Sequence, residues 1–415
     1  MKIPELLAPA ATYACAVAAF DNGADAVYAG LGTHNLRARS PNFGIDQLDE
    51  LLGCAHDRGK RAYIALNVLP DDSKIREIEL SLKKLETIRC LPDAFIVADP
   101  GVMDLCRKHV PEVPLHLSTQ TGTFNSASAG FWARFGIRRV ILPREMTIEA
   151  IQRIVAAGLM ETEVFIHGAM CVSISGRCLL GAYTENRHPN FGDCPQPCRL
   201  RYKIAPLRSP SDESMREGEW YTVEEDPSSG SFILNSKDLN ALPVLDRIVA
   251  SGVTALKIEG RNRSLHYVAS VVKVYRAALD GLARGGAYVP HPQLGEELQR
   301  LDHRPYTTGF YAGESQLQDL SRHDTRQGGD YRVVGVVRDQ LDGKGAVVDV
   351  KNPFLIGDSV SVISAGQGVI AHEAVIVELT DINGNAIGKA LTNRVVVCTT
   401  KPGVQVGDIL RKKLS

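Results

Sequence analysis

Short apolar runs recur along the first two thirds of the chain, and each run ends in a polar or glycine-rich corner. Most of them are continuous rather than alternating, which is typical of strands buried on both faces of a parallel sheet. Eight segments fit this description: Glu5–Ala8, Ala26–Ala29, Ala62–Val68, Ala94–Ala98, Leu115–Thr119, Val140–Leu142, Val164–Ile166 and Ala255–Ile258. We interpret them as eight parallel strands.

Helical patterns fill the gaps between these runs. The segment 75–88 is apolar at the spacing of one helix face, with Ile75, Ile78, Leu82, Leu85 and Ile88. Further helices are predicted at Ala11–Phe20, Ile148–Ala157, Leu239–Ala250 and Tyr267–Leu279, each followed closely by glycine. Strands that alternate with helices predict an α/β fold of the (β/α)8-barrel type, with a doubly wound open sheet as the alternative. A long insertion separates the seventh predicted strand from the eighth.

The pattern changes near residue 331. Five β-like segments follow, with hairpin turns at Asp342-Gly343 and Asn383-Gly384: Tyr331–Val337, Gly345–Val350, Ser359–Ser364, Val369–Leu379 and Asn393–Thr399. We therefore expect a barrel-like catalytic domain over residues 1–285, a connector over 286–330 and a small all-β barrel domain over 331–415. The small domain would dock RNA or cover the large domain, and the basic end Arg411-Lys412-Lys413 weakly favours RNA.

Composition and charge add little bias toward any partner. Of the 415 residues, 44% are hydrophobic and 23% are charged, and the formal net charge is -1. This balance excludes a global attraction to nucleic acid or to membranes, so an RNA contact requires a local basic patch. No apolar stretch approaches the roughly 20 residues that span a bilayer, and no signal peptide opens the chain. We therefore expect a cytoplasmic protein without a membrane partner.

Four of the nine cysteines fall in one segment, at Cys171, Cys178, Cys194 and Cys198, with the spacing C-x6-C-x15-C-x3-C. Cytoplasmic thiols stay reduced, so clustered cysteines favour a metal centre over disulfides. Structural zinc sites prefer C-x2-C pairs, which this segment lacks, whereas long spacings suit a loop around a [4Fe–4S] cluster. The spacing alone favours the cluster and leaves zinc as the alternative, with the cluster loop at about residues 168–235.

The carboxyl ends of the predicted strands are unusually polar. In a (β/α)8 barrel these ends form the active-site mouth. Here they carry Asn67, Gln120, Arg144, His167, Glu259 and Arg261. Because Cys171 closely follows His167, the cysteine segment is predicted to lie beside the same mouth. We also expect an ion pair between Lys257 and Glu259.

Several motifs resemble one known family. The segments Glu163–Cys171 and Ser175–Leu180 are similar to the signature of the collagenase-like peptidase superfamily. Other matching segments are Glu5–Ala10, Gly23–Gly30, Leu36–Arg39, His116–Gln120, Asn235–Leu239 and Lys257–Arg261. The resemblance covers about residues 1–310, and similarity to the tRNA-hydroxylating branch of the family extends through the C-terminal domain.

The resemblance implies an RNA-modifying hydroxylase that forms 5-hydroxyuridine at the tRNA wobble position with prephenate as co-substrate. It also implies that the four clustered cysteines hold a [4Fe–4S] cluster; the electron donor is not indicated. Related branches hydroxylate a ribosomal RNA cytidine or a ubiquinone precursor, so another RNA or a quinone precursor is the alternative substrate.

Roles for individual residues follow from that chemistry. Prephenate is a dicarboxylate, and guanidinium groups bind carboxylates in a bidentate manner. We predict that substrate is bound by Arg144, Arg177, Arg261, Asn67 and Lys257. The candidate catalytic residues are His167, Glu259 and Gln120. The alternative for each arginine is a local ion pair, such as Arg144 with Glu145.

Three basic groups are candidates for phosphate contacts: Arg199, Arg201, Lys203 and Arg208; Arg37 and Arg39; and Arg134, Arg138 and Arg139. A solvated basic face is the alternative for each of them. A peptidase is the alternative enzyme class. The sequence contains neither H-E-x-x-H nor G-x-S-x-G, and cysteines committed to a cluster cannot act as nucleophiles, which argues against proteolysis.

Overall fold

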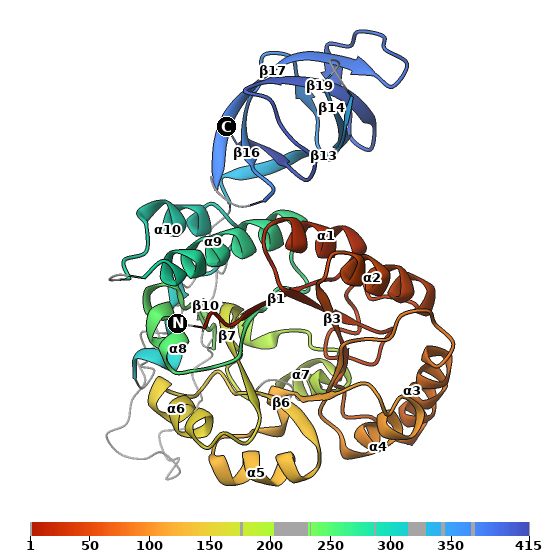
Figure 1. The fold of residues 1–415 in the computed structure, drawn as a ribbon, viewed down its shortest axis with the longest axis vertical. Coiled ribbons are helices and arrows are strands. Elements are labelled where there is room, and N and C mark those ends of the chain that lie inside the picture. The colour runs from red at the N-terminus through yellow and green to blue at the C-terminus, as the bar shows by residue number, and fades with distance from the viewer. Residues whose placement is uncertain are drawn as a thin grey trace, which may run out of the picture.

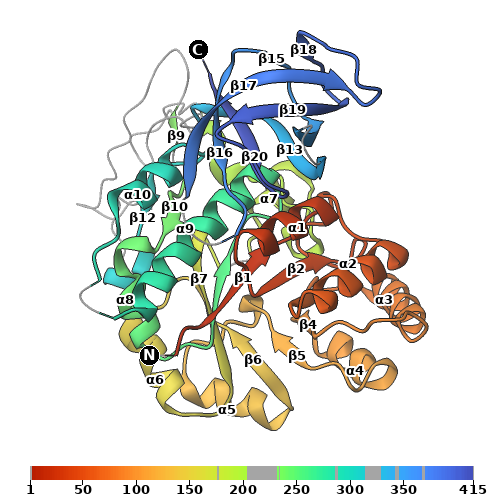
Figure 2. The ribbon, with the colours of Figure 1, turned by 45° about the horizontal axis from the view of Figure 1, so that its top comes forward.

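The computed structural model describes residues 2–174, 177–202, 231–232, 234–285, 288–313, 329–341, 345–366 and 370–414. Figure 1 shows a large barrel with a smaller β-barrel above it, and Figure 2 shows the small barrel resting over α9, α10 and α1. Within the described part of the chain, no helix combines the length and apolar character required to cross a membrane.

Eight parallel strands form the large barrel, and they match the eight predicted segments. They are β1 (Glu5–Pro9), β2 (Ala26–Gly30), β3 (Arg61–Leu66), β4 (Ala94–Val97), β5 (Leu115–Leu117), β6 (Ile137–Ile141), β7 (Glu161–Ala169) and β11 (Ala255–Ile258). The ring closes because β11 pairs in parallel with both β7 and β1. The strands are almost entirely buried, which explains their continuous apolar runs. The (β/α)8 prediction is therefore confirmed, and the open sheet is excluded.

Helices on the outside of the barrel connect these strands: α1 (Tyr13–Asp21), α2 (Ile45–Asp57), α3 (Asp72–Leu85), α4 (Pro100–His109), α5 (Ser126–Arg134), α6 (Ile148–Ala156), α8 (Leu245–Ala250) and α9 (Leu265–Ala283). Short polar side chains fix where many of them begin. Asp71 accepts a hydrogen bond from the Lys74 amide, and Ser264 accepts one from the Tyr267 amide. Such N-caps satisfy amides that the first helical turn leaves without a partner.

The segment between β7 and β11 carries the insertion. It contains α7 (Leu180–Glu185), the short strands β8 (Arg201–Tyr202) and β9 (Ser231–Phe232), and β10 (Asp238–Asn240), which pairs antiparallel with β7. The predicted start of a helix at Leu239 is wrong, because that residue pairs with β7 and the helix α8 begins only at Leu245. Beyond α9, the described residues include α10 (Pro292–Gln299) and β12 (Tyr306–Thr307), which extends the sheet beside β10.

The C-terminal domain is a closed antiparallel barrel, as predicted. Its strands are β13 (Tyr331–Leu341), β14 (Gly345–Val350), β16 (Ser359–Ile363), β17 (Ala371–Asp381), β19 (Val395–Lys401) and β20 (Ile409–Lys413). The small pair β15 (Phe354–Leu355) and β18 (Lys389–Ala390) lies beside it. The sequence pattern missed β20, whose apolar part is only two residues long.

One buried arginine joins the two barrels. Arg411 of β20 is fully buried; its Nη2 donates to Glu297 Oε2 of α10 at 2.7 Å, and its Nη1 lies 3.0 Å from His266 Nε2 of α9. Lys273 of α9 donates to the carbonyl of Ser364 at 2.9 Å across the same interface. The weak assignment of the basic end to RNA is therefore wrong for Arg411, because a buried paired cation cannot reach a phosphate.

Candidate active site at the barrel mouth

A cavity of about 80 Å³ lies at the carboxyl ends of the barrel strands. Tyr28 of β2, Phe165 of β7 and Lys257 of β11 form part of its wall. The loops that follow the strands contribute Arg37, Asn67, Ser118, Arg144, Cys171, Glu259 and Arg261. Side chains from strands and loops far apart in the sequence therefore converge where barrel enzymes carry out their chemistry.

Glu259 is the only acidic side chain among the described residues that line this cavity. Its Oε1 accepts a hydrogen bond from Arg37 Nη2 at 3.2 Å, and its Oε2 lies 3.7 Å from Arg144 Nη2. Burial alone would raise the pKa of the Glu259 carboxyl, but Arg37, Arg144 and Arg261 outweigh it and hold that pKa at about 2. Glu259 is therefore ionised at neutral pH and cannot donate a proton there.

Two further cations, Lys257 and Arg261, complete the wall. Lys257 Nζ donates to Glu163 Oε1 of β7 at 2.8 Å and lies 4.3 Å from the centre of the Tyr28 ring. The expected Lys257–Glu259 ion pair is therefore wrong, because Glu163 is fully buried within reach of Lys257 while arginines occupy Glu259. Burial lowers the pKa of Arg261 to about 10, so its guanidinium remains charged at pH 7.

The cavity is consequently cationic. Among the described lining residues, Arg37, Arg144 and Arg261 surround one carboxylate, that of Glu259, while Lys257 is paired with Glu163. A wall with more positive than negative groups attracts a ligand with more than one negative charge, and guanidinium forks match carboxylates in geometry. The structure thus brings together the predicted residues Asn67, Arg144, Lys257, Glu259 and Arg261 in a site suited to a small polyanion.

Two glycines allow these groups to come so close. Gly168 follows His167 with a φ of 105°, and a Cβ there would collide with the Glu259 carbonyl oxygen. At Gly30, the end of β2, a Cβ would collide with the Arg261 guanidinium. Any larger residue at either position would displace Glu259 or Arg261 from the cavity.

Gln120 lies behind the cavity wall rather than in it. Its Nε2 donates to the Asn67 carbonyl at 2.7 Å, and its Oε1 accepts from the Ser118 hydroxyl at 2.9 Å. Asn67 in turn accepts from the Leu36 amide at 3.3 Å, which ties the end of β3 to the loop that carries Arg37. The predicted catalytic residue Gln120 therefore positions lining residues and does not itself face the cavity.

His167 is likewise outside the described lining of the cavity. Its ring is 1% exposed and lies among Tyr267, Tyr275 and Tyr306, with Nδ1 3.3 Å from the Tyr275 hydroxyl. Burial lowers the pKa of His167 to about 3, so the imidazole is neutral at pH 7. The structure places His167 as a packed core residue beside the site.

The clustered cysteines lie next to the cavity. Cys171 lines it, while Cys178, Cys194 and Cys198 are half-buried, and none of these four described cysteines forms a disulfide. Burial raises the pKa of Cys194, and the nearby Cys171 and Cys178 raise it further. The predicted substrate ligand Arg177 lies in the same segment with an exposed side chain, outside the cavity lining.

The chemistry of these cysteines suits an iron–sulfur cluster, whereas their spacing in this structure is too wide to hold one. Four cysteine thiols outside any disulfide, with Cys171 close enough to raise the pKa of both Cys194 and Cys198, provide the donor set that such a cluster requires. Among the residues that the structure describes, however, no three His, Cys, Asp or Glu side chains converge closely enough to hold a metal ion. A cluster held by all four thiolates would therefore require these thiols to lie closer together than they do in this structure.

Arg37 is the site residue that sequence reasoning missed. We grouped it with Arg39 as a phosphate contact, but Arg37 faces the cavity whereas Arg39 donates to Asp193 at 2.7 Å on the outside. A signal was present, since Arg37 lies within one of the segments that match the family.

Arg139 is also misassigned to RNA: it is 3% exposed and pairs inside the barrel with Glu5 at 2.8 Å. Of the remaining basic candidates, Lys203 and Arg208 lie outside the described residues.

Comparison with known proteins places this site in a family. Residues 11–320 match the model of peptidase family U32, and residues 329–411 match the peptidase family U32 C-terminal domain. Among curated relatives, tRNA hydroxylation protein P of Escherichia coli strain K12 is 37% identical over 87% of this chain and 86% of its own. The protein of that name from Haemophilus influenzae is 35% identical over 87% and 86% of the two chains. A relative from Methanocaldococcus jannaschii, named an uncharacterized protease, is 33% identical over 89% of each. The chain belongs to peptidase family U32.

Proposed function

We propose that this protein hydroxylates tRNA, forming 5-hydroxyuridine at the wobble position with prephenate as co-substrate. Two relatives that align over most of this chain are named tRNA hydroxylation proteins. The observation that carries the proposal is the cationic cavity around Glu259, with Cys171 in its wall. A small dicarboxylate and a thiolate-held redox centre are the ligands that such a site would serve.

The residues of the cavity would divide the work of binding. Arg144 and Arg261 would pair with the carboxylates of prephenate, since their forks lie at the wall and their charge exceeds that of Glu259. Arg37 keeps Glu259 ionised, so this carboxylate would accept a proton or a hydrogen bond and not donate one. Burial raises the pKa of the Tyr28 hydroxyl well above 10, so Tyr28 remains a hydrogen-bond donor.

Cys171, Cys178, Cys194 and Cys198 would hold the [4Fe–4S] cluster. When bound, such a cluster supplies electron transfer or an open iron position, neither of which the side chains provide. The protein's own contribution would be to keep this centre beside the anion-binding wall.

Proteolysis is supported only by family names, including that of the archaeal relative. A serine or cysteine peptidase requires a base beside its nucleophile. The described lining of the cavity includes the hydroxyls of Ser118 and Thr119 and the thiol of Cys171, but it includes no histidine, and the other candidate bases, Lys257 and Glu259, are paired with Glu163 and Arg37. The geometry therefore favours the hydroxylase.

The direct test is to delete the gene in its host and digest the tRNA to nucleosides. Mass spectrometry should show loss of wobble 5-hydroxyuridine and its return when the wild-type gene, but not the Glu259→Gln gene, is restored. Unchanged 5-hydroxyuridine would exclude the proposal. Loss of 5-hydroxycytidine from ribosomal RNA, or of a hydroxylated quinone, would instead identify one of the alternative substrates.

A further inference from the structure

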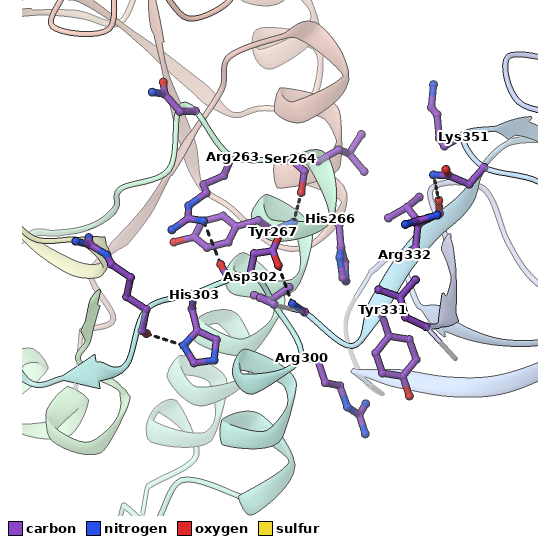
Figure 3. Close-up of a pocket in the computed structure, with 18 of the residues that line it drawn as sticks. Arg263, Ser264, His266, Tyr267, Arg300, Asp302, His303, Tyr331, Arg332 and Lys351 are labelled. Carbon is purple, nitrogen blue, oxygen red and sulfur yellow. Dashed lines mark hydrogen bonds between the residues drawn. The ribbon is translucent and has the colours of Figure 1, made fainter. Parts of the chain in front are cut away.

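A second and much larger hollow, of about 940 Å³, lies between the two barrels. Figure 3 shows its two walls: Arg263, Arg300 and Asp302 come from the large domain, and Tyr331, Arg332 and Lys351 come from the C-terminal barrel. We call this hollow the interdomain cleft. It is distinct from the small cavity at the barrel mouth.

The interdomain cleft carries more basic than acidic side chains. Among the described residues that line it, six are basic, namely Arg199, Arg263, Arg300, Arg304, Arg332 and Lys351, and one is a carboxylate, Asp302. The acids behind the wall are shared: Asp238 pairs with both Arg263 and Arg304, Glu297 pairs with both Arg300 and Arg411, and Asp349 pairs with both Lys351 and Arg338. Positive charge therefore remains in excess, although the whole chain is nearly neutral.

Two short segments of the chain border both the cleft and the active site. After β11, Glu259 and Arg261 line the cavity while Asn262 and Arg263 line the cleft. In the cysteine segment, Gln196 and Arg199 line the cleft on either side of Cys198. A strand bound in the cleft would therefore be led toward the cationic cavity.

Other features of the cleft suit a phosphodiester chain. The helix α9 begins in its wall at Leu265, and the amide end of a long helix carries partial positive charge. The ring of Tyr331 lies in the wall, and its centre is 4.6 Å from the Arg411 guanidinium and 5.5 Å from that of Arg300. Aromatic rings beside cations are the platform on which nucleotide bases stack.

We infer that the interdomain cleft binds the sugar–phosphate backbone of the RNA strand that carries the target nucleotide into the cavity. This inference rests on the proposed function. RNA fits better than a protein partner, because the excess charge is positive and the wall is polar, whereas protein interfaces are depleted in charge at their centre. The C-terminal barrel would thus be half of the RNA site.

The test compares two charge-reversal variants of the full-length protein. Arg332→Glu with Lys351→Glu alters the cleft wall at side chains that are exposed in the structure. Lys389→Glu with Arg394→Glu makes the same change of charge on exposed positions of the same domain outside the described cleft lining. The probe is unfractionated tRNA from a gene-deletion strain, and its affinity is measured by fluorescence anisotropy at several salt concentrations.

We expect the cleft variant to bind this tRNA about tenfold more weakly, with a shallower salt dependence, because two phosphate contacts are lost. The control variant should bind like the wild type. Equal losses in both variants, or no loss in either, would overturn the inference. Prephenate affinity should be unchanged in the cleft variant, which separates this claim from the proposed chemistry. Deletion of the gene could leave 5-hydroxyuridine intact while the cleft variant alone loses tRNA affinity. That result would support the cleft as an RNA-binding site and would contradict the proposed hydroxylation.

Discussion

The side chains of Arg37 and Glu259 meet across the barrel mouth at 3.2 Å, although 222 residues separate them in the chain. The contact joins the loop after β2 to the loop after β11. It fixes the protonation state of the one carboxylate in the described cavity lining, because Arg37 is the strongest of the charges that lower the pKa of Glu259. Arg37 thus sets both the charge and the shape of the cavity.

Removing a cavity arginine should weaken binding of the dicarboxylate. A hydrogen bond to a charged group contributes about 1.5–3 kcal/mol, so Arg261→Ala should raise the dissociation constant for prephenate roughly tenfold to a hundredfold. Titration calorimetry with purified protein measures this directly. Arg153→Ala, an exposed arginine on α6, is the matched control and should bind like the wild type. If the Arg261 variant bound prephenate as tightly as the wild type, the cavity would not be the prephenate site.

The charges inside the barrel predict a contrast between neighbours. Arg139 is buried and pairs with Glu5 at 2.8 Å and Glu163 at 3.2 Å, whereas Arg138 is exposed and pairs with Glu161 at 2.9 Å. Arg139→Met removes one cation from Glu5 and Glu163, which keep Arg61 and Lys257, and should lower the free energy of unfolding by about 1.5–3 kcal/mol. Arg138→Met should cost less than about 1 kcal/mol. Urea unfolding of both variants checks this, and similar losses would contradict the packing described.

Acid should destabilise the fold partly through His167. Its pKa falls from 6.5 to about 3 on burial, so below pH 6.5 the unfolded chain binds a proton that the folded chain does not. The stability that the neutral ring contributes is complete above pH 6.5 and declines by about 1.4 kcal/mol per pH unit toward pH 3. Replacing His167 by Gln should flatten unfolding free energy against pH in this range. Parallel curves for the variant and the wild type would show that His167 titrates normally.

The sequence predicted much of this architecture for a physical reason. Strands buried on both faces, such as β2 and β4, require continuous apolar runs, and such runs are visible without any tertiary information. The strand β20 was not predicted because Arg411 interrupts its apolar pattern. Only the tertiary structure shows that Glu297 neutralises that charge. The same limit explains Arg37, whose partner is set by barrel closure and not by any local pattern.

The cysteine cluster was evident from the spacing in the sequence. That these cysteines bind an iron–sulfur cluster remains a prediction. We expect protein purified without oxygen to contain iron and acid-labile sulfide, and Cys178→Ser to lose most of both, because a cluster needs all of its thiolates. The matched control is Cys90→Ser, a half-buried cysteine outside the segment, which should retain the wild-type content. If the wild-type protein contained zinc and no sulfide, the four cysteines would form a structural zinc site and not a cluster.

Reconstitution of the reaction tests the proposed hydroxylation most directly. Anaerobically purified protein is incubated with tRNA from the deletion strain and with a gel-filtered extract of that strain, which supplies the oxidant and the oxygen source that hydroxylation of uridine requires. The incubation is done with and without prephenate, and the wobble nucleoside is identified by mass spectrometry. We predict 5-hydroxyuridine only when prephenate and the wild-type protein are both present, and none with Glu259→Gln. Unmodified uridine with the iron-loaded wild-type protein and prephenate, or equal product without prephenate, would contradict it.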